Sequence, residues 1–168
     1  MSSYIQIVDQ NDELVTHKEN SHVDRVNDIY RVSALWLTSL EGDVLIAQRK
    51  LTKAHDPGKW GPAVSGTVEQ EETYESNMYK EAEEEIGLSG VRLSAGPKTH
   101  IKEPWHYFCQ WFTCEIDKQS HKLSLQDEEV EAIAWVPFDD LAKEVIDNPS
   151  KFVPGFSDII QLFAGVRR

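Results

Sequence analysis

The sequence predicts an α/β (α+β) protein built as an α/β/α sandwich, in which helices cover both faces of a mixed β-sheet. Short β-type runs recur along the chain between Gly, Pro, Asn and Asp residues, and three segments have helical character. The 168 residues are 40% hydrophobic and 27% charged, which is typical of a globular chain whose core forms without disulfides or a structural metal. We therefore expect a single domain over residues 1–168.

The strands follow from apolar or alternating runs between turn-forming residues. The first two runs predict a hairpin, because residues 9–12 are Asp, Gln, Asn and Asp. This hairpin belongs to an N-terminal extension, residues 1–30. In chain order, we expect strands at Ile5–Val8, Glu13–His17, Arg31–Thr38, Val44–Gln48, Ala63–Ser65, Val91–Leu93, Lys98–Ile101, Trp105–Cys114 and Glu131–Val136.

Two or three helices are expected between and after these strands. Thr73–Ile86 is rich in helix-forming residues, and Gly87 is placed to cap its end. Pro137 begins a second helix that runs to about Ile146, and the third covers Ser157–Phe163. With the strands, these helices predict a mixed sheet sandwiched between helical layers.

The charge balance restricts the partners. Seventeen basic and twenty-nine acidic residues give a net charge of -12, which argues against a nucleic-acid polymer or an anionic membrane and favours a cation. No apolar run approaches the roughly 18 residues of a membrane span, and the N-terminus lacks a secretory pattern, so a cytoplasmic location is expected. Cys109 and Cys114 share one expected strand, where they are too far apart to bridge and are expected to be buried thiols.

Three carboxylates gather on one stripe of the first helix. At about 100° per residue, Glu81, Glu84 and Glu85 fall within an arc of about 100°. Like charges three and four positions apart destabilise a helix, so the cluster favours a bound cation. Carboxylate oxygens suit Mg²⁺ or Mn²⁺, and Mg²⁺ commonly bridges carboxylates and substrate phosphates. On the helix alone, a solvated acidic face is the alternative.

The remaining faces of this helix are also predicted by its periodicity. Met78, Ala82 and Ile86 occupy the adjacent stripe and are expected to face the core. Lys80 and Glu83 are expected on the opposite flank. The acidic stripe would then lie at the border between the core and solvent.

The spacing around the helix favours the metal interpretation. The pattern consists of Gly66, Glu72, Lys80, Glu81, Glu84, Glu85 and Gly87. Five residues separate Gly66 from Glu72, and seven separate Glu72 from Lys80. This pattern over residues 66–88 resembles the Nudix box, and it departs from the box at one fixed position, where Lys80 replaces Arg. A Lys cannot form the bidentate fork that Arg offers a carboxylate. The difference therefore concerns the rigidity of the loop rather than metal binding.

The resemblance implies a Nudix-type sandwich that binds divalent metal and hydrolyses a diphosphate joined to another group. It implies that Glu81, Glu84 and Glu85 are metal ligands, with Glu72 as an extra ligand or helper. A metal cluster would neutralise phosphate oxygens and acidify a water molecule. Glu84 and Glu81 are the expected catalytic residues, and Glu84 is the expected general base. Glu129 is the alternative base, unless it is an ordinary acid in a solvated loop.

A second resemblance covers much of the chain. Val8–Val15 and Gln48–Lys53 are similar to the corresponding parts of isopentenyl diphosphate isomerases and of the Nudix hydrolases closest to them. In the isomerases an Arg and a Lys four positions apart hold the diphosphate, and Arg49 and Lys53 match this pair. A basic pair beside an acidic metal site is a reasonable diphosphate clamp. The alternative is two surface residues at the end of a strand.

The residues that isomerisation requires are different here. Ser65 stands where the isomerases have a catalytic Cys, and Thr67 stands where they have a His. A serine hydroxyl has a far higher pKa than a thiol and is a poor substitute in proton transfer. We therefore expect an Mg²⁺- or Mn²⁺-dependent pyrophosphohydrolase acting on a small nucleoside diphosphate derivative or related diphosphate. An isomerase and a non-catalytic diphosphate-binding module remain alternatives, and a homodimer is suggested by family analogy alone.

Overall fold

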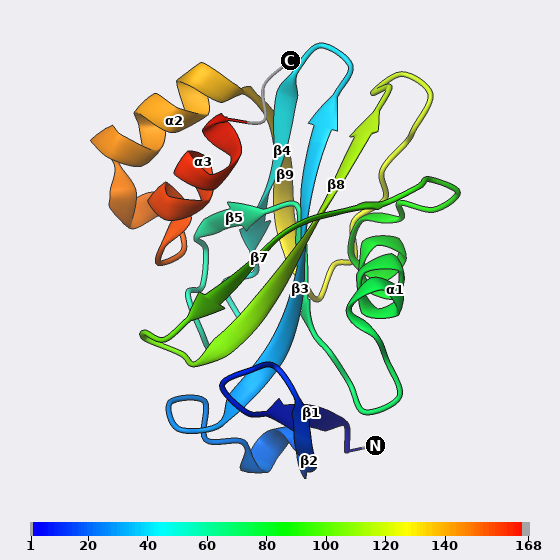
Figure 1. Cartoon of the computed structure of the whole chain (residues 1–168). Coiled ribbons are helices and arrows are strands. Elements are labelled where there is room, and N and C mark those ends of the chain that lie inside the picture. Colours follow the sequence, from blue (N-terminus) through cyan, green and yellow to red (C-terminus); the bar gives the residue numbers. More distant parts are fainter. Residues whose placement is uncertain (1, 166–168) are drawn as a thin grey trace.

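In the computed structural model, which describes residues 2–165, a nine-stranded mixed sheet has α-helices on both faces (Figure 1). The strands are β1 (Tyr4–Val8), β2 (Leu14–Glu19), β3 (Ile29–Ser39), β4 (Asp43–Arg49), β5 (Trp60–Pro62), β6 (Val64–Thr67), β7 (Ser94–Ile101), β8 (Tyr107–Ile116) and β9 (Val130–Pro137). The helices are α1 (Tyr74–Ile86), α2 (Phe138–Asp147) and α3 (Phe156–Ala164), with short 3₁₀ turns at Asn20–His22 and Pro149–Lys151. The predicted sandwich with an N-terminal hairpin is confirmed.

The long strand β3 organises the sheet. It pairs in parallel with β8 along ten residues and in antiparallel orientation with β1, β4 and β6. Strand β7 continues the sheet beyond β8, and β9 lies against β4. The hairpin β1–β2 extends the sheet at one end of β3 (Figure 1). Residues from distant parts of the sequence therefore meet around β3 and β4.

Alternation along β3 divides the core between the two faces of the sheet. Leu35 and Leu37 pack in the cluster that contains α1. Ala34 and Trp36 pack in the cluster formed with α2 and α3, where the Trp36 ring stacks on Phe163 with the ring centroids 4.4 Å apart. None of the helices in residues 2–165 is long and apolar enough to cross a membrane.

Two predicted strands are placed differently by the structure. The strand expected at Ala63–Ser65 begins one residue later, as β6, and Ala63 separates it from β5, because β5 pairs with β4 whereas β6 pairs with β3. The segment Val91–Leu93 is not a strand. Its last residue is buried, and the amide of Leu93 donates a hydrogen bond to the hydroxyl of Tyr79 at 3.0 Å, so the segment packs on α1 rather than joining the sheet.

Both cysteines are confirmed as free, buried thiols. Cys109 and Cys114 lie in β8, on opposite sides of the sheet. Burial raises the pKa of the Cys109 thiol to about 12, so it is a packing residue at neutral pH rather than a nucleophile.

Asp12 connects the hairpin turn to the sheet and to α1. It has a left-handed backbone with φ of 63°, which short polar side chains tolerate. Its carboxylate lies 2.7 Å from Nε of Arg31 and 2.5 Å from Nζ of Lys98, and it accepts a hydrogen bond from the hydroxyl of Tyr74 at 2.9 Å. These contacts join β3, β7 and the start of α1 to the hairpin.

The ionisation of Asp12 should make stability depend on pH. Burial alone would raise its pKa, but the hydrogen bonds from Lys98, Arg31 and Tyr74 outweigh burial, so the pKa lies below the ordinary value. A depressed folded-state pKa gives stability that is present above the unfolded pKa and is lost as the pH falls through the folded pKa. Chemical denaturation between about pH 5 and pH 2 should therefore show a smaller loss of unfolding free energy for Asp12→Asn than for wild type. Equal losses would contradict this assignment.

Candidate metal and diphosphate site

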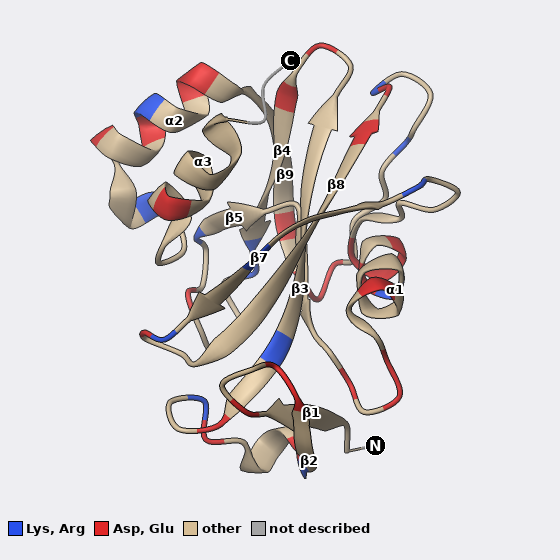
Figure 2. Ribbon diagram, in the orientation of Figure 1, with Lys and Arg blue, Asp and Glu red and all other residues tan. Residues whose placement is uncertain are grey.

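The helix that carries the acidic stripe begins and ends where its sequence predicts. The Thr73 hydroxyl accepts a hydrogen bond from the amide of Ser76, and the Ser76 hydroxyl accepts one from the amide of Thr73, which forms a capping box. Gly87 ends the helix in the left-handed conformation, with φ of 66°. As predicted, Met78 and Ala82 are buried in the core against the sheet. Figure 2 shows acidic residues on α1 and along the loop that precedes it.

Strand β6 passes immediately beside Glu81. A Cβ atom added to Gly66 would lie 2.6 Å from Cδ and 2.8 Å from Oε1 of Glu81, which is closer than real Cβ contacts. The glycine is therefore required by space rather than by its backbone conformation. Because Gly66 has no side chain, the carboxylate of Glu81 can lie against β6.

The loop before α1 directs Glu72 toward the helix. One oxygen of its carboxylate accepts hydrogen bonds from the amide of Glu69 at 2.9 Å and from Nδ2 of Asn77 at 2.8 Å. The other oxygen lies 2.5 Å from Nζ of Lys80. Burial alone would raise the pKa of Glu72, but the bonds from Lys80, Glu69 and Asn77 outweigh it and lower the pKa. Glu72 is thus held as an anion.

The position expected for Lys80 is wrong. Its ammonium group lies 3.5 Å from Oε1 of Glu81 as well as beside Glu72, so it points toward the acidic stripe instead of the opposite flank. The helical period places the Lys80 backbone correctly, but the loop before α1 folds back along the helix, and its Glu72 attracts the long, flexible Lys80 side chain. The Lys80 ammonium thus lies beside two of the predicted metal ligands, Glu72 and Glu81.

Asn77 is a site residue that the sequence analysis missed. It is fully buried, and its amide nitrogen donates to the carbonyl of Thr67 at 3.1 Å as well as to the Glu72 carboxylate. Its amide oxygen accepts a hydrogen bond from the Ser33 hydroxyl. The available signal was an Asn four positions before Glu81, on the stripe of the helix that borders the core, because a buried amide requires specific partners.

Removing this amide should be costly. Asn77→Ala leaves the Ser33 hydroxyl and the Thr67 carbonyl without this partner, and we expect a loss of about 2–3 kcal/mol in the free energy of unfolding. Chemical denaturation measures it. The exposed Asn11 supplies the control, since Asn11→Ala should change stability far less. Similar values for the two variants would contradict the role of Asn77.

Glu85 lies where the predicted acidic and basic groups meet. Burial, followed by repulsion from Glu81 and Glu129, raises the pKa of Glu85 to about 8, whereas Lys53 and Arg49 act to lower it. The structure therefore places the other four side chains within electrostatic range of Glu85. Burial is also the main cause of the raised pKa of Glu81.

The end of β4 and the loop after it carry the basic pair, Arg49 and Lys53. Lys53, in the loop after β4, forms an ion pair with Glu129, which precedes β9. Lys50, in the same loop after β4, lies 3.1 Å from Glu131 of β9. Nε of Arg49 donates to the carbonyl of His55 at 3.0 Å, which fixes its guanidinium at the end of β4.

The loop before β9 also packs against the C-terminal end of α1. The amide of Gln126 donates to the carbonyl of Glu85 at 2.9 Å, and the amide of Ser124 donates to that of Ile86 at the same distance. Glu84, by contrast, is exposed on α1 and raises the pKa of the neighbouring Glu81. Of the predicted acids on α1, Glu84 is thus open to solvent, while Glu81 and Glu85 are half-buried.

These residues fit a divalent cation in their donor chemistry. Carboxylates are hard oxygen ligands, and burial, with repulsion from neighbouring acids, raises the pKa values of Glu81 and Glu85, so a bound cation would stabilise their charged forms. Within residues 2–165, however, no three His, Cys, Asp or Glu side chains converge closely enough to form a ready coordination site. Binding would therefore require side-chain adjustment, including movement of the Lys80 ammonium relative to Glu81.

Comparisons with known proteins agree with the box. The chain is 28% identical over 161 residues to a prenyl-diphosphate phosphatase of Methanosarcina mazei, covering 95% of this chain and 94% of that protein. It is 31% identical over 133 residues to an isopentenyl-diphosphate Delta-isomerase of Roseobacter denitrificans, covering 74% of each. A crystal structure of a Deinococcus radiodurans protein superposes with a TM-score of 0.83 at 17% identity, covering 94% of this chain and 97% of that one, which shows the shared fold.

The family model for the NUDIX domain matches residues 29–156, which include the complete box, the basic pair and Glu129. The matched region begins after the β1–β2 hairpin. With the sandwich fold and the intact acidic positions of the box, this match confirms the resemblance, and the chain belongs to the Nudix hydrolase family.

Proposed function

We propose that this chain is a divalent-metal-dependent hydrolase that cleaves the diphosphate linkage of a small molecule, a nucleoside diphosphate derivative or a related diphosphate. The observation that carries the proposal is the arrangement around Glu85 of α1, which lies within electrostatic range of Arg49 and Lys53 as well as of Glu81 and Glu129. Acids that can bind a cation and bases that can bind phosphate oxygens are the two components that a diphosphate requires.

The proposed roles follow from charge and exposure. Arg49 and Lys53 hold the diphosphate oxygens, with the guanidinium able to bind two of them at once. Glu81, Glu84 and Glu85 hold the metal, assisted by Glu72. When bound, Mg²⁺ or Mn²⁺ supplies charge neutralisation and a more acidic water molecule.

Exposure favours Glu84 over Glu129 as the general base. Glu84 is open to solvent on α1, so its carboxylate can accept a proton from water. Glu129 is engaged with Lys53, and protonating it would break this ion pair. Substrate that draws Lys53 away would free Glu129. Single-turnover assays of Glu84→Gln and Glu129→Gln, each at a Mg²⁺ concentration that saturates the variant, therefore assign the base.

A prenyl diphosphate is a second candidate substrate, since the Methanosarcina relative is named for that class and aligns with nearly the whole chain. Isomerisation is disfavoured despite the Roseobacter relative. The hydroxyls of Ser65 and Thr67 stand where that chemistry needs a thiol and an imidazole.

The test is release of phosphate or monophosphate from nucleotide sugars, dinucleotides, nucleoside triphosphates, and isopentenyl and longer prenyl diphosphates, with Mg²⁺ and with EDTA. We expect metal-dependent release from one class of these compounds. Formation of dimethylallyl diphosphate without hydrolysis would contradict the proposal in favour of an isomerase. Metal-dependent binding without turnover would contradict it in favour of a binding module.

A further inference from the structure

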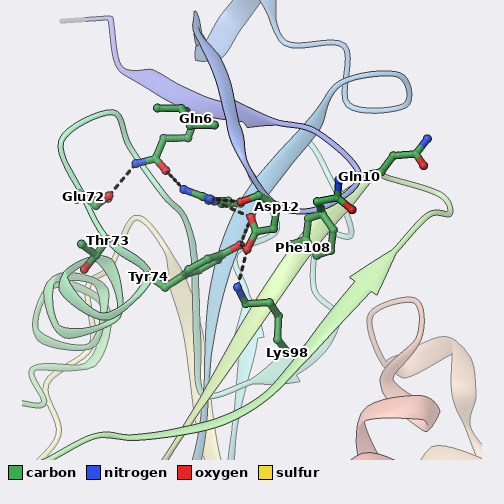
Figure 3. Close-up of a pocket in the computed structure, with 11 residues that line it drawn as sticks. Gln6, Gln10, Asp12, Glu72, Thr73, Tyr74, Lys98 and Phe108 are labelled. Atoms are coloured by element: carbon green, nitrogen blue, oxygen red, sulfur yellow. Dashed lines mark hydrogen bonds and ion pairs between the residues drawn. The ribbon is translucent and has the colours of Figure 1, made fainter.

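We propose that Gln6, in the N-terminal hairpin, is a positioning residue that holds the loop carrying Glu72 in its place beside α1. This inference rests on the proposed metal site. Gln6 is only 5% exposed in a polar setting (Figure 3), and the two hydrogens of its Nε2 are shared among three carbonyls of one loop. The acceptors are the carbonyls of Glu69 at 2.9 Å, Gln70 at 3.3 Å and Glu72 at 2.7 Å.

The orientation of the Gln6 amide is fixed from its other end. Nη1 of Arg31, on β3, donates to Oε1 of Gln6 at 2.7 Å, so the amide nitrogen must face the loop. Arg31 is itself held, because its Nε donates to the carboxylate of Asp12 at 2.7 Å. Figure 3 shows Gln6 and Asp12 and the contact from Gln6 to the carbonyl of Glu72.

The charged groups in this region are already matched. They line a pocket of about 750 Å³ between the hairpin turn and the start of α1. The pocket has two cations, Arg31 and Lys98, which both contact Asp12, and Glu72 is a second carboxylate in its lining. This pairing favours a supporting role for the network over capture of a second anionic ligand.

Backbone contacts bring β1 alongside the same loop. The amide of Gln70 donates to the carbonyl of Tyr4 at 2.8 Å, and the amide of Gln6 donates to that of Val68 at 3.4 Å. The loop in turn positions Glu72, since the amide of Glu69 binds the Glu72 carboxylate. A change at Gln6 therefore reaches the carboxylate through the loop and without touching it.

Lys80 gives this chain a reason to need the additional support. An Arg at this box position could hold two carboxylate oxygens with a planar fork, whereas the Lys80 ammonium is a single point of charge, 2.5 Å from one oxygen of Glu72. Gln6 lies outside residues 29–156, the part matched by the family model. The hairpin thus makes the loop more rigid and compensates for Lys80, which holds the loop less firmly than an Arg would.

Gln6→Met tests the role, because it keeps the length and burial of the side chain and removes the amide. In EDTA, hydrogen exchange at the amides of Glu69 and Glu72 should accelerate about tenfold relative to wild type, while amides in α3 stay unchanged. Mn²⁺ affinity should fall by about tenfold, as for other residues that orient metal ligands. The matched control is Gln10→Met, at an exposed glutamine of the same hairpin, which should change neither quantity.

Two further variants keep the test decisive. Gln6→Glu retains an acceptor for Arg31 but cannot donate to the loop, so it should reproduce the faster exchange if Gln6→Met does not fold. Lys80→Arg combined with either variant should recover at least half of the lost Mn²⁺ affinity, which a general loss of stability would not predict.

The outcomes separate this inference from the proposed function. Unchanged exchange at Glu69 and Glu72 in both Gln6 variants would overturn the positioning role. Failure of Lys80→Arg to restore Mn²⁺ affinity would overturn the compensation for the missing Arg. If wild type binds no Mn²⁺, the proposed function fails, and the exchange rates still decide whether Gln6 holds the loop.

Discussion

Replacing Glu85 by Gln is expected to lower turnover by about 100- to 1,000-fold, in the range found when a group that stabilises transition-state charge is removed. Glu85 is the acid that Glu81 and Glu129 repel and that Arg49 and Lys53 attract. Gln keeps the shape of the side chain but cannot supply an anionic ligand. Steady-state rates at saturating Mg²⁺ measure the effect.

The same change should not destabilise the protein. The folded-state pKa of about 8 lies above the ordinary 4.5, so the folded state binds more protons between these values and loses stability as the pH rises. Gln removes that loss. In EDTA at pH 8, Glu85→Gln should be at least as stable as wild type by chemical denaturation.

The exposed Glu83 provides the control on the same helix. Glu83→Gln should retain both activity and stability, since surface acids contribute little to stability. A folded Glu85→Gln protein with near-normal turnover would refute the role of Glu85 as a metal ligand.

Gly66→Ala is expected to have the second large effect. The new Cβ would meet Cδ of Glu81 at 2.6 Å, so either the strand or the carboxylate must move. Overpacking of this kind typically costs about 1–3 kcal/mol of stability. Displacement of Glu81 should also lower turnover and Mn²⁺ affinity, which denaturation, kinetics and metal titration measure separately.

Gly165→Ala is the matched control, because its added Cβ would meet no heavy atom within 4 Å and its backbone is right-handed. It should behave as wild type. If Gly66→Ala keeps wild-type stability and metal affinity, the close approach of β6 to Glu81 is not important for the site.

Local signals explain what could be predicted from the sequence. Thr73 and Gly87 fix the two ends of α1 through contacts within a few residues, and the helical period then places Glu81 and Glu85 on one stripe. The box spacing located the acids, and the four-residue spacing located Arg49 and Lys53. These features depend on neighbours in the chain, so a single sequence reveals them.

Contacts between distant residues explain what could not be predicted. The change of partner at Ala63 depends on where β3 and β4 lie, not on the residues around it. The direction of Lys80 depends on the fold of the preceding loop. Gln6 contacts carbonyls more than 60 positions away, so no local pattern distinguishes it from any other strand glutamine.

The central claim is that the acidic stripe of α1 binds a divalent cation beside the basic pair. Titration of Mn²⁺ into the wild-type protein, followed by the electron paramagnetic resonance signal of free Mn²⁺, tests it without knowledge of the substrate. We predict that wild type and Glu83→Gln deplete the free-ion signal and that Glu85→Gln does so only at about tenfold or higher concentration. Equal depletion by wild type and Glu85→Gln, or no depletion by wild type, would contradict the account.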